Sequence, residues 1–328
     1  MNDAGASLLT RSSVKRAGKH ALCRSVVKYS FLAPIRMKTL AVALFALASV
    51  LPASAYDPGV VKELTAKGAK FTETKGAVSG ADVADISKWT DEDFQKLASI
   101  SGLEKLSFGK GLNDHQLSIL VSNTQISAFV TNGAELSDEG VKQFARFPKL
   151  QALTFFHPGK AFAGPGLAAL ADLPLLDNLT VAGSSAFGNE GVDAIARLGH
   201  LKSLRVFHTN ADQSGIAKIS GLKNLTSLMI GQRLSNTPPV ALSDQTMKLV
   251  ASFPAMESLT FSEARLSLPA LSQLRQLSKL KRLTLDSIDL GSGKESDLAG
   301  ALPGVQIKYT APNEAGAKRI KALFGSGS

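Results

Sequence analysis

The side chains in this sequence that could do chemistry are a few aromatic, histidine and arginine residues, and their grouping favours binding over catalysis. Phe156-His157 and Phe207-His208 are two similar pairs, and Arg205 lies beside the second pair. Exposed aromatic residues next to arginine are the side chains that dominate the binding energy of protein interfaces. We therefore take these residues as a candidate binding site, which with Met229 comprises Phe156, His157, Arg205, Phe207, His208 and Met229.

The same residues do not form a recognisable catalytic or metal site. His157 and His208 could be imagined as two metal ligands, but no carboxylate is expected near them, and zinc sites use three or four ligands. The sequence contains no G-x-S-x-G motif of a hydrolase, and its glycines form no phosphate-binding pattern. We expect no catalytic residues, no metal and no cofactor, and hence no enzyme.

Charge and cysteine content exclude two further classes. The formal net charge is +10, but residues 1–36 carry +6 of it and Lys38 one more, which leaves +3 for residues 56–328. A nucleic-acid footprint has to lie on the folded domain, so we expect no nucleic-acid partner. The one cysteine, Cys23, excludes an intrachain disulfide and a cysteine-rich zinc site.

An export signal is indicated by the apolar segment that follows the basic residues 1–36. Lys38 precedes an apolar run from Thr39 to Leu51, and Ala53-Ser54-Ala55 has the small-x-small pattern of a signal-peptidase site. The run is shorter than the ~20 residues that span a membrane. We predict a signal peptide at 37–55, cleavage near Ala55, and a periplasmic or extracellular protein without a transmembrane segment in the mature chain. Residues 1–36 are interpreted as an extension upstream of a misassigned start; their composition also permits organelle targeting.

The elements that must position the candidate residues recur along the rest of the chain. The pattern L-x-x-L-x-(apolar) recurs at residues 103, 126, 150, 176, 201, 225, 256, 280 and 305, with degraded copies at 126 and 305. The longest step spans an insertion from Arg233 to Leu242 that contains Pro238-Pro239. A fixed period of this length predicts a repeat architecture with one short strand in each unit.

A helix is predicted between successive strands. LSDEGVKQFARFP, FGNEGVDAIARLG and LSDQTMKLVASFP each place a small polar residue and an acid ahead of apolar residues at helical spacing. Ser137 and Ser243 can cap the first turn, and the acids complement the helix dipole. Gly140 and Gly191 lower helix propensity, so the helices should be short. Stacked units would form a parallel sheet on one side and a row of helices on the other.

These repeats resemble the leucine-rich repeat family over roughly residues 78–309. The S/T-D-x-G turn is similar to the bacterial, exported type, and not to the repeat with an asparagine ladder. The residues at the ladder position are Gly111, Pro158, Ser184, Thr209, Arg233, Ala264 and Ile288. The resemblance implies an α/β leucine-rich-repeat solenoid with a curved parallel sheet on the concave side and short helices on the convex side, which binds partners on the concave sheet.

Strand geometry places the candidate residues on that concave sheet. Alternate side chains of a strand face opposite sides, so the residues between the core leucines face outward. They are mostly Ser, Thr, Ala and Gly, and Phe156, Arg205, Phe207 and Met229 stand out among them, with His157 and His208 at the rim. The alternative interpretation is that each Phe packs against its neighbours and each His is a solvated turn residue.

The expected organisation is an N-terminal cap with a divergent first repeat at 56–102, repeats at 103–309, and a C-terminal cap helix and tail at 310–328. Within the first segment, Thr90 and Asp93 form a capping-box pattern ahead of a helix. We expect an exported, monomeric, non-enzymatic bacterial protein that binds a protein or a cell-envelope polymer through its concave sheet.

Two alternatives stay open at this stage. The chain could be a structural envelope component whose basic edges contact an anionic polymer. Those edges are Lys279, Lys281, Arg282, Lys318, Arg319 and Lys321. By analogy alone, similar repeats are substrate receptors in ubiquitin ligases.

Overall fold

The computed structural model describes residues 57–235 and 238–325. The chain divides into two units, Met1–Val50 and Leu51–Ser328, and all described residues belong to the second unit. The expected signal peptide at 37–55 and the extension at 1–36 lie outside the described residues. No helix within the described ranges is long and apolar enough to span a membrane.

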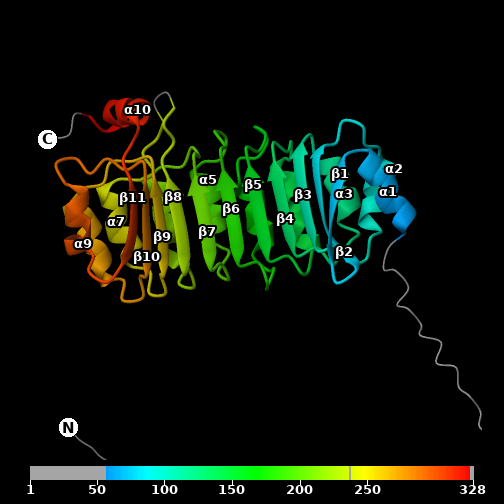
Figure 1. Cartoon of the computed structure of the whole chain (residues 1–328), viewed down its shortest axis with the longest axis horizontal. Coiled ribbons are helices and arrows are strands. Elements are labelled where there is room, and N and C mark those ends of the chain that lie inside the picture. The colour runs from blue at the N-terminus through cyan, green and yellow to red at the C-terminus, as the bar shows by residue number, and fades with distance from the viewer. Residues whose placement is uncertain (1–56, 236–237, 326–328) are drawn as a thin grey trace, which may run out of the picture. The chain divides into compact units, whose positions relative to one another are not determined.

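In the described residues, eleven strands form one sheet in which spatial order equals chain order (Figure 1). From β2 onward every pair is parallel, and equivalent repeat positions face each other, as in Leu153–Leu179 and Leu179–Leu204. The strands are β1 (Ala69–Thr74), β2 (Ala77–Asp85), β3 (Lys105–Lys110), β4 (Ala128–Asn132), β5 (Ala152–Phe156), β6 (Asn178–Ala182), β7 (Ser203–Phe207), β8 (Ser227–Gly231), β9 (Ser258–Ser262), β10 (Arg282–Asp286) and β11 (Gln306–Thr310).

Short helices connect the strands and cover one face of the sheet (Figure 1). The α-helices are α1 (Pro58–Ala66), α2 (Asp91–Ala98), α3 (Asp114–Leu120), α4 (Asp138–Lys142), α5 (Asn189–Ile195), α6 (Gln213–Ala217), α7 (Asp244–Val250), α8 (Leu268–Ser272), α9 (Leu298–Ala301) and α10 (Glu314–Phe324). The 3-10 helices are η1 (Gln143–Arg146), η2 (Pro165–Leu170), η3 (Lys218–Gly221), η4 (Gln273–Gln276) and η5 (Glu295–Asp297). The prediction of a leucine-rich-repeat solenoid is confirmed. We call the sheet face away from the helices the open sheet face.

The first strand pair departs from the parallel pattern. β1 pairs antiparallel with β2, an arrangement that the repeat pattern did not predict. Lys75 and Gly76 between the two strands both have positive φ, of 54° and 78°. Two consecutive residues in this conformation form the tight turn that joins antiparallel strands, so no helix is needed. β1 thereby covers the edge of β2, which an open parallel sheet would leave exposed.

A continuous core lies between the sheet and the helices. The repeat leucines, with Phe129 in their place in β4, are buried on the inner side of the strands from β3 to β10. In the first half of the solenoid phenylalanine rings contact one another from repeat to repeat, with centroid separations of 4.8 to 6.0 Å. The rings are those of Phe94, Phe108, Phe129, Phe144, Phe155, Phe162 and Phe187. Each unit therefore depends on its neighbours for burial of its apolar surface.

Carboxylates at the helix N-termini connect successive repeats. Asp114 accepts hydrogen bonds from Ser137 N at 2.9 Å and Ser137 Oγ at 2.5 Å, and Asp244 makes the same pair of bonds with Ser267. Asp138 accepts three backbone bonds from the following unit. These bonds satisfy N–H groups that a helix terminus leaves free. We call these three residues, Asp114, Asp138 and Asp244, the aspartate ladder; each is the first residue of its helix.

The C-terminal helix α10 lies on the side of the sheet where the strands end (Figure 1). Its Ile320 is fully buried, and Arg265 Nη1 donates to the Gly325 carbonyl at 2.7 Å. The segment 310–328 was predicted to be a cap helix and tail, and the function of α10 as a cap stays a prediction.

Candidate functional site

The residue after each strand from β3 to β10 has a characteristic backbone conformation. These residues have positive φ, except Gln232, which precedes the insertion; they are Gly111, Gly133, His157, Gly183, His208, Glu263 and Ser287. The left-handed conformation favours glycine and costs other residues roughly 1–2 kcal/mol each. His157, His208 and Glu263 therefore occupy positions where glycine would be less strained, and their side chains form a rim along the open sheet face.

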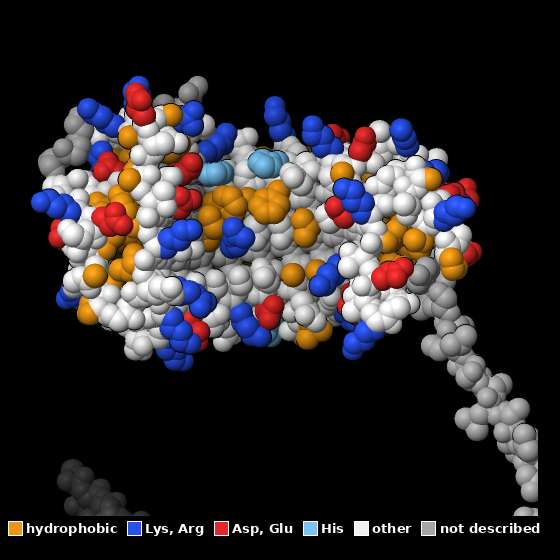
Figure 2. All heavy atoms as spheres, in the orientation of Figure 1, with side chains coloured by type: hydrophobic (Ala, Val, Ile, Leu, Met, Phe, Trp, Pro, Cys, Tyr) orange, Lys and Arg blue, Asp and Glu red, His pale blue; other side chains and the backbone are white. Residues whose placement is uncertain are grey.

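Two aromatic rings meet on the open sheet face across strand β6. Phe156, Ala182 and Phe207 are register partners on β5, β6 and β7. The rings of Phe156 and Phe207 approach edge to face, with centroids 6.5 Å apart. Both phenylalanines are half-buried, whereas Ala182 between them is 2% exposed. The rings thus form a raised apolar patch on a face otherwise made of short side chains. Figure 2 shows hydrophobic side chains gathered in the middle of this face, with histidine beside them.

Arg205 lies next to this patch without an acidic partner. Its guanidinium carbon is 5.5 Å from the centroid of the Phe207 ring, and its Nε and Nη2 are each 3.4 Å from Met229 Sδ. Arg205 and Met229 are register partners on β7 and β8. No carboxylate of the described residues lies within ion-pair distance of Arg205. The guanidinium thus contacts a sulfur and an aromatic ring, and the residue is exposed.

The two histidines at the rim contact different partners. His208 Nε2 is 2.5 Å from Glu263 Oε2, and its ring meets the Phe207 ring at 5.3 Å. His157 Nδ1 is 3.1 Å from Asn132 Oδ1. The structure therefore brings His208 to the aromatic patch and turns His157 toward β4. In the part of the chain that the structure describes, no three His, Cys, Asp or Glu side chains group as metal ligands.

Sequence reasoning missed Glu263, Asn132 and Ser262 as neighbours of the candidate site. Ser262 is 5% exposed, and its Oγ has no hydrogen-bond partner among the described residues. A Cβ at Gly231 would lie 2.4 Å from this Oγ and 2.6 Å from Phe207 Cβ, so only glycine fits there. Glu263 occupies the after-strand position that His157 and His208 occupy in their own repeats. That equivalence is the signal that could have identified Glu263.

A hollow adjoins the aromatic patch on the side toward the preceding strands of the sheet. Its volume is about 470 Å³, and Asn132 and His157 form the side nearest to β5. Ala84 and Gly109 also line the hollow. A Cβ at Gly109 would lie 2.0 Å from the Ala84 carbonyl oxygen, so the two backbones are too close for any residue but glycine there. The open sheet face therefore combines a raised aromatic patch with an adjacent depression.

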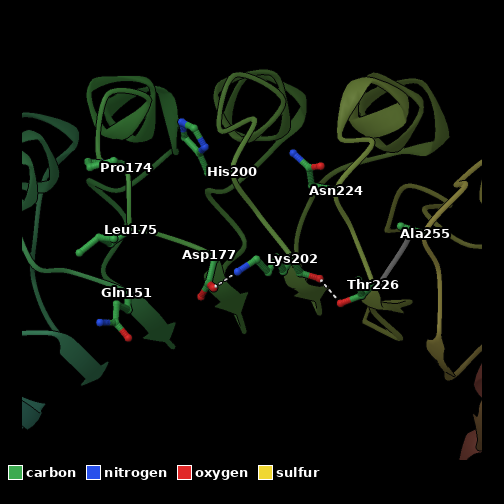
Figure 3. A pocket seen from close by; sticks show the side chains of 9 residues that line it. All are labelled: Gln151, Pro174, Leu175, Asp177, His200, Lys202, Asn224, Thr226 and Ala255. Atoms are coloured by element: carbon green, nitrogen blue, oxygen red, sulfur yellow. Dashed lines mark hydrogen bonds and ion pairs between the residues drawn. The ribbon is translucent and has the colours of Figure 1, made fainter. Parts of the chain in front are cut away.

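A larger groove, of about 690 Å³, lies at the opposite ends of the strands and was not predicted. Gln151, Asp177, Lys202 and Thr226 in its lining each directly precede a strand. Figure 3 shows the Asp177–Lys202 ion pair, which spans 3.0 Å, inside it. Leu175 in the same lining is 45% exposed. The charges in the groove are paired, and none of the candidate residues reaches it.

The basic edges of the alternative hypothesis are partly neutralised. Lys281 Nζ lies 2.8 Å from Glu257 Oε2, and Lys318 Nζ lies 2.8 Å from Glu314 Oε1. The hydrogen bond and charge of Lys281 hold the pKa of Glu257 below its ordinary value, so the Glu257 carboxylate is ionised at neutral pH. These lysines therefore present less net charge than the sequence count suggests.

Comparisons with known proteins concern the fold. No protein-family model and no curated protein matches the chain. Among solved structures, an internalin from Listeria monocytogenes is similar with 16% identity and a TM-score of 0.45, over 81% of this chain and 78% of that chain. Internalin C2 from the same organism is similar with 16% identity and a TM-score of 0.41, over 77% of this chain and 93% of that chain.

Proposed function

We propose that this chain is an exported, non-enzymatic leucine-rich repeat protein that binds a protein partner through its open sheet face. The binding site is centred on Phe156, Arg205, Phe207 and Met229, with His157 and His208 at the rim. The observation that carries the proposal is the contact of two half-buried phenylalanine rings with an unpaired arginine on a face of short side chains.

The physical argument concerns the free energy that such a cluster would release on binding. The Phe156 and Phe207 rings still expose apolar surface, whose burial is favourable by roughly 25 cal/mol per Å². The rings and the guanidinium support one another, so little side-chain freedom is left to lose. Aromatic and arginine anchors of this kind dominate protein interfaces. The surrounding serine and threonine hydroxyls supply the polar rim that such interfaces have.

The proposal of export is based on the signal-peptide pattern in the sequence at 37–55.

The ion pairs of Lys281 and Lys318 weigh against an anionic polymer as the principal partner. An anionic surface would have to compete with Glu257 and Glu314 for these lysines. Exposed pairs of this kind are weak, so strong salt dependence of binding would be the signature of the polymer alternative.

The test is a pull-down from the native extracytoplasmic fraction with the full chain carrying a C-terminal affinity tag. The variant is Phe156→Ala/Arg205→Ala/Phe207→Ala. A matched control is Leu175→Ala/Arg197→Ala, which removes an exposed leucine and an exposed arginine away from the open sheet face. Unfolding in urea shows that all three proteins are folded.

We expect a partner that the wild type and the control retain and the triple variant loses. Equal retention by all three proteins, or no partner at all, would contradict the proposal. Salt-sensitive retention by all three proteins would favour the polymer alternative.

A further inference from the structure

We infer that the site on the open sheet face takes a peptide segment in which an acidic residue stands two positions from a hydrophobic one. The carboxylate would pair with Arg205, and the hydrophobic side chain would pack against the Phe156 and Phe207 rings. This inference rests on the proposed function and specifies the chemistry of its partner.

Arg205 is arranged to receive a carboxylate. A thioether sulfur is a weak acceptor, so the contacts to Met229 Sδ position the guanidinium without satisfying its five N–H donors. The Phe207 ring supports it from the side. A planar guanidinium held in place can form two parallel hydrogen bonds to a carboxylate, the strongest common side-chain pair. Because the side chain is already ordered, the entropic cost of forming that pair is small.

The charge pattern around Arg205 favours acidic peptides over basic ones. Arg205 is the one charged residue among the outward-facing strand positions from β4 to β9. Glu263, at the rim, has its carboxylate against His208 Nε2. The next charges on the face are Arg282 and Asp286 on β10, three strands away. A basic peptide would meet an unpaired like charge, whereas an acidic one would meet an unpaired opposite charge.

The spacing of the two anchors determines the spacing in the peptide. Arg205 and Phe207 are two positions apart on β7, which corresponds to about 6.6 Å along a strand. An extended peptide also places its i and i+2 side chains on one side at this separation. The acidic and hydrophobic residues would therefore be two positions apart.

Ser262 provides a separate indication of a ligand at this place. Its Oγ is buried without a partner, and it lies beside Gly231 and Phe207. A buried hydroxyl without a hydrogen bond is costly. A peptide group brought over Gly231 would offer this hydroxyl an acceptor.

The experiment is a selection of phage-displayed random linear peptides on the immobilised full chain, followed by titration of a synthetic selected peptide. We expect enrichment of Asp or Glu two positions from a large hydrophobic residue. Changing that acid to its amide should weaken binding to the wild type at least tenfold. Arg205→Gln should weaken binding of the parent peptide to the same extent. Binding of the amide peptide to Arg205→Gln should be no weaker than binding with either change alone.

Arg197→Gln, a change of an exposed arginine just after α5, is the matched control and should leave the affinity unchanged. An unchanged urea unfolding midpoint for Arg205→Gln excludes misfolding as the cause.

Two failures are distinguishable. If Phe156→Ala and Phe207→Ala abolish binding while Arg205→Gln does not, the acidic–hydrophobic assignment is wrong and the proposed function stands. If neither the phenylalanine nor the arginine changes affect any selected peptide, both are wrong.

Discussion

Phe155 and Phe156 are consecutive residues of β5 that lie on opposite faces of the sheet. Phe155 is completely buried and meets Phe144 and Phe162, whereas Phe156 is half-buried and meets Phe207 on the open sheet face. The same residue type, one position apart, thus belongs to the core in one case and to the candidate site in the other.

This difference gives a prediction about stability. Phe155→Ala should lower the free energy of unfolding by about 3–5 kcal/mol, because it leaves a cavity among packed rings. Phe156→Ala should lower it by only about 1 kcal/mol, because much of the ring already faces solvent. Urea unfolding of the two single variants measures both values. Equal losses would place Phe156 in the core and remove it from the binding site.

A substitution at Gly183 is expected to be destabilising, and more so while His157 is present. Gly183 has a φ of +72°, and a Cβ there would lie 2.5 Å from His157 Cδ2. Gly183→Ala should therefore cost roughly 1–2 kcal/mol for the backbone conformation, plus the displacement of the histidine ring from Asn132.

The second contribution can be separated by a double-mutant cycle. In a His157→Ala background the ring is absent, so Gly183→Ala should cost about 0.5–1 kcal/mol less. Additive losses in urea unfolding would mean that the ring and the glycine are not coupled.

The aspartate ladder gives a prediction about repeat coupling. Asp138 accepts hydrogen bonds from Ala163 N, Gly164 N and Gly166 N at 2.9, 2.9 and 3.0 Å. Asp138→Ala leaves these donors without partners and should lower the free energy of unfolding by about 2–3 kcal/mol.

The neighbouring Glu139→Ala removes only an exposed ion pair with Lys142 and should change the free energy of unfolding by less than about 0.5 kcal/mol. Thermal and urea unfolding of both variants make the comparison. Similar effects of the two changes would show that the ladder bonds contribute little.

Asp93 should make the N-terminal part of the solenoid sensitive to acid. Burial disfavours its charge, but hydrogen bonds from Lys67 and Thr90 outweigh this and hold the pKa of Asp93 below its ordinary value of 3.8. A lowered pKa contributes stability that is fully present above the ordinary value and is lost as pH falls through the lowered one. Its carboxylate is 2.6 Å from Lys67 Nζ, and its side chain is 1% exposed.

Asp93→Asn should therefore lower the free energy of unfolding at pH 7 by about 1–3 kcal/mol. Between pH 5 and pH 2 the free energy of unfolding should fall less for the variant than for the wild type. Urea unfolding across this pH range tests the prediction. If the free energy of unfolding of the variant falls as steeply between pH 5 and pH 2 as that of the wild type, other carboxylates account for the acid sensitivity.

The repeat architecture could be predicted because its cause is local and periodic. Most units place one buried leucine shortly before the strand and another at its second position, so the register follows from counting, and Leu204 and Leu228 pair as expected. The same alternation placed Phe156 and Phe207 on one face and in one row. The antiparallel β1 could not be predicted from the period, because its pairing depends on a turn with positive φ at Lys75 and Gly76.

The sequence by itself determined the strand–helix period, the face of each strand that packs inward, and the two phenylalanines and the arginine that stand outside. The tertiary structure decided which of these side chains touch. The contact between His208 and Glu263 joins residues 55 positions apart, and the support of Arg205 by Met229 depends on the neighbouring strand. Such contacts depend on side-chain rotamers and on stacking between repeats. A linear pattern of residue types specifies neither, because each repeat acquires its neighbours only when the solenoid is assembled.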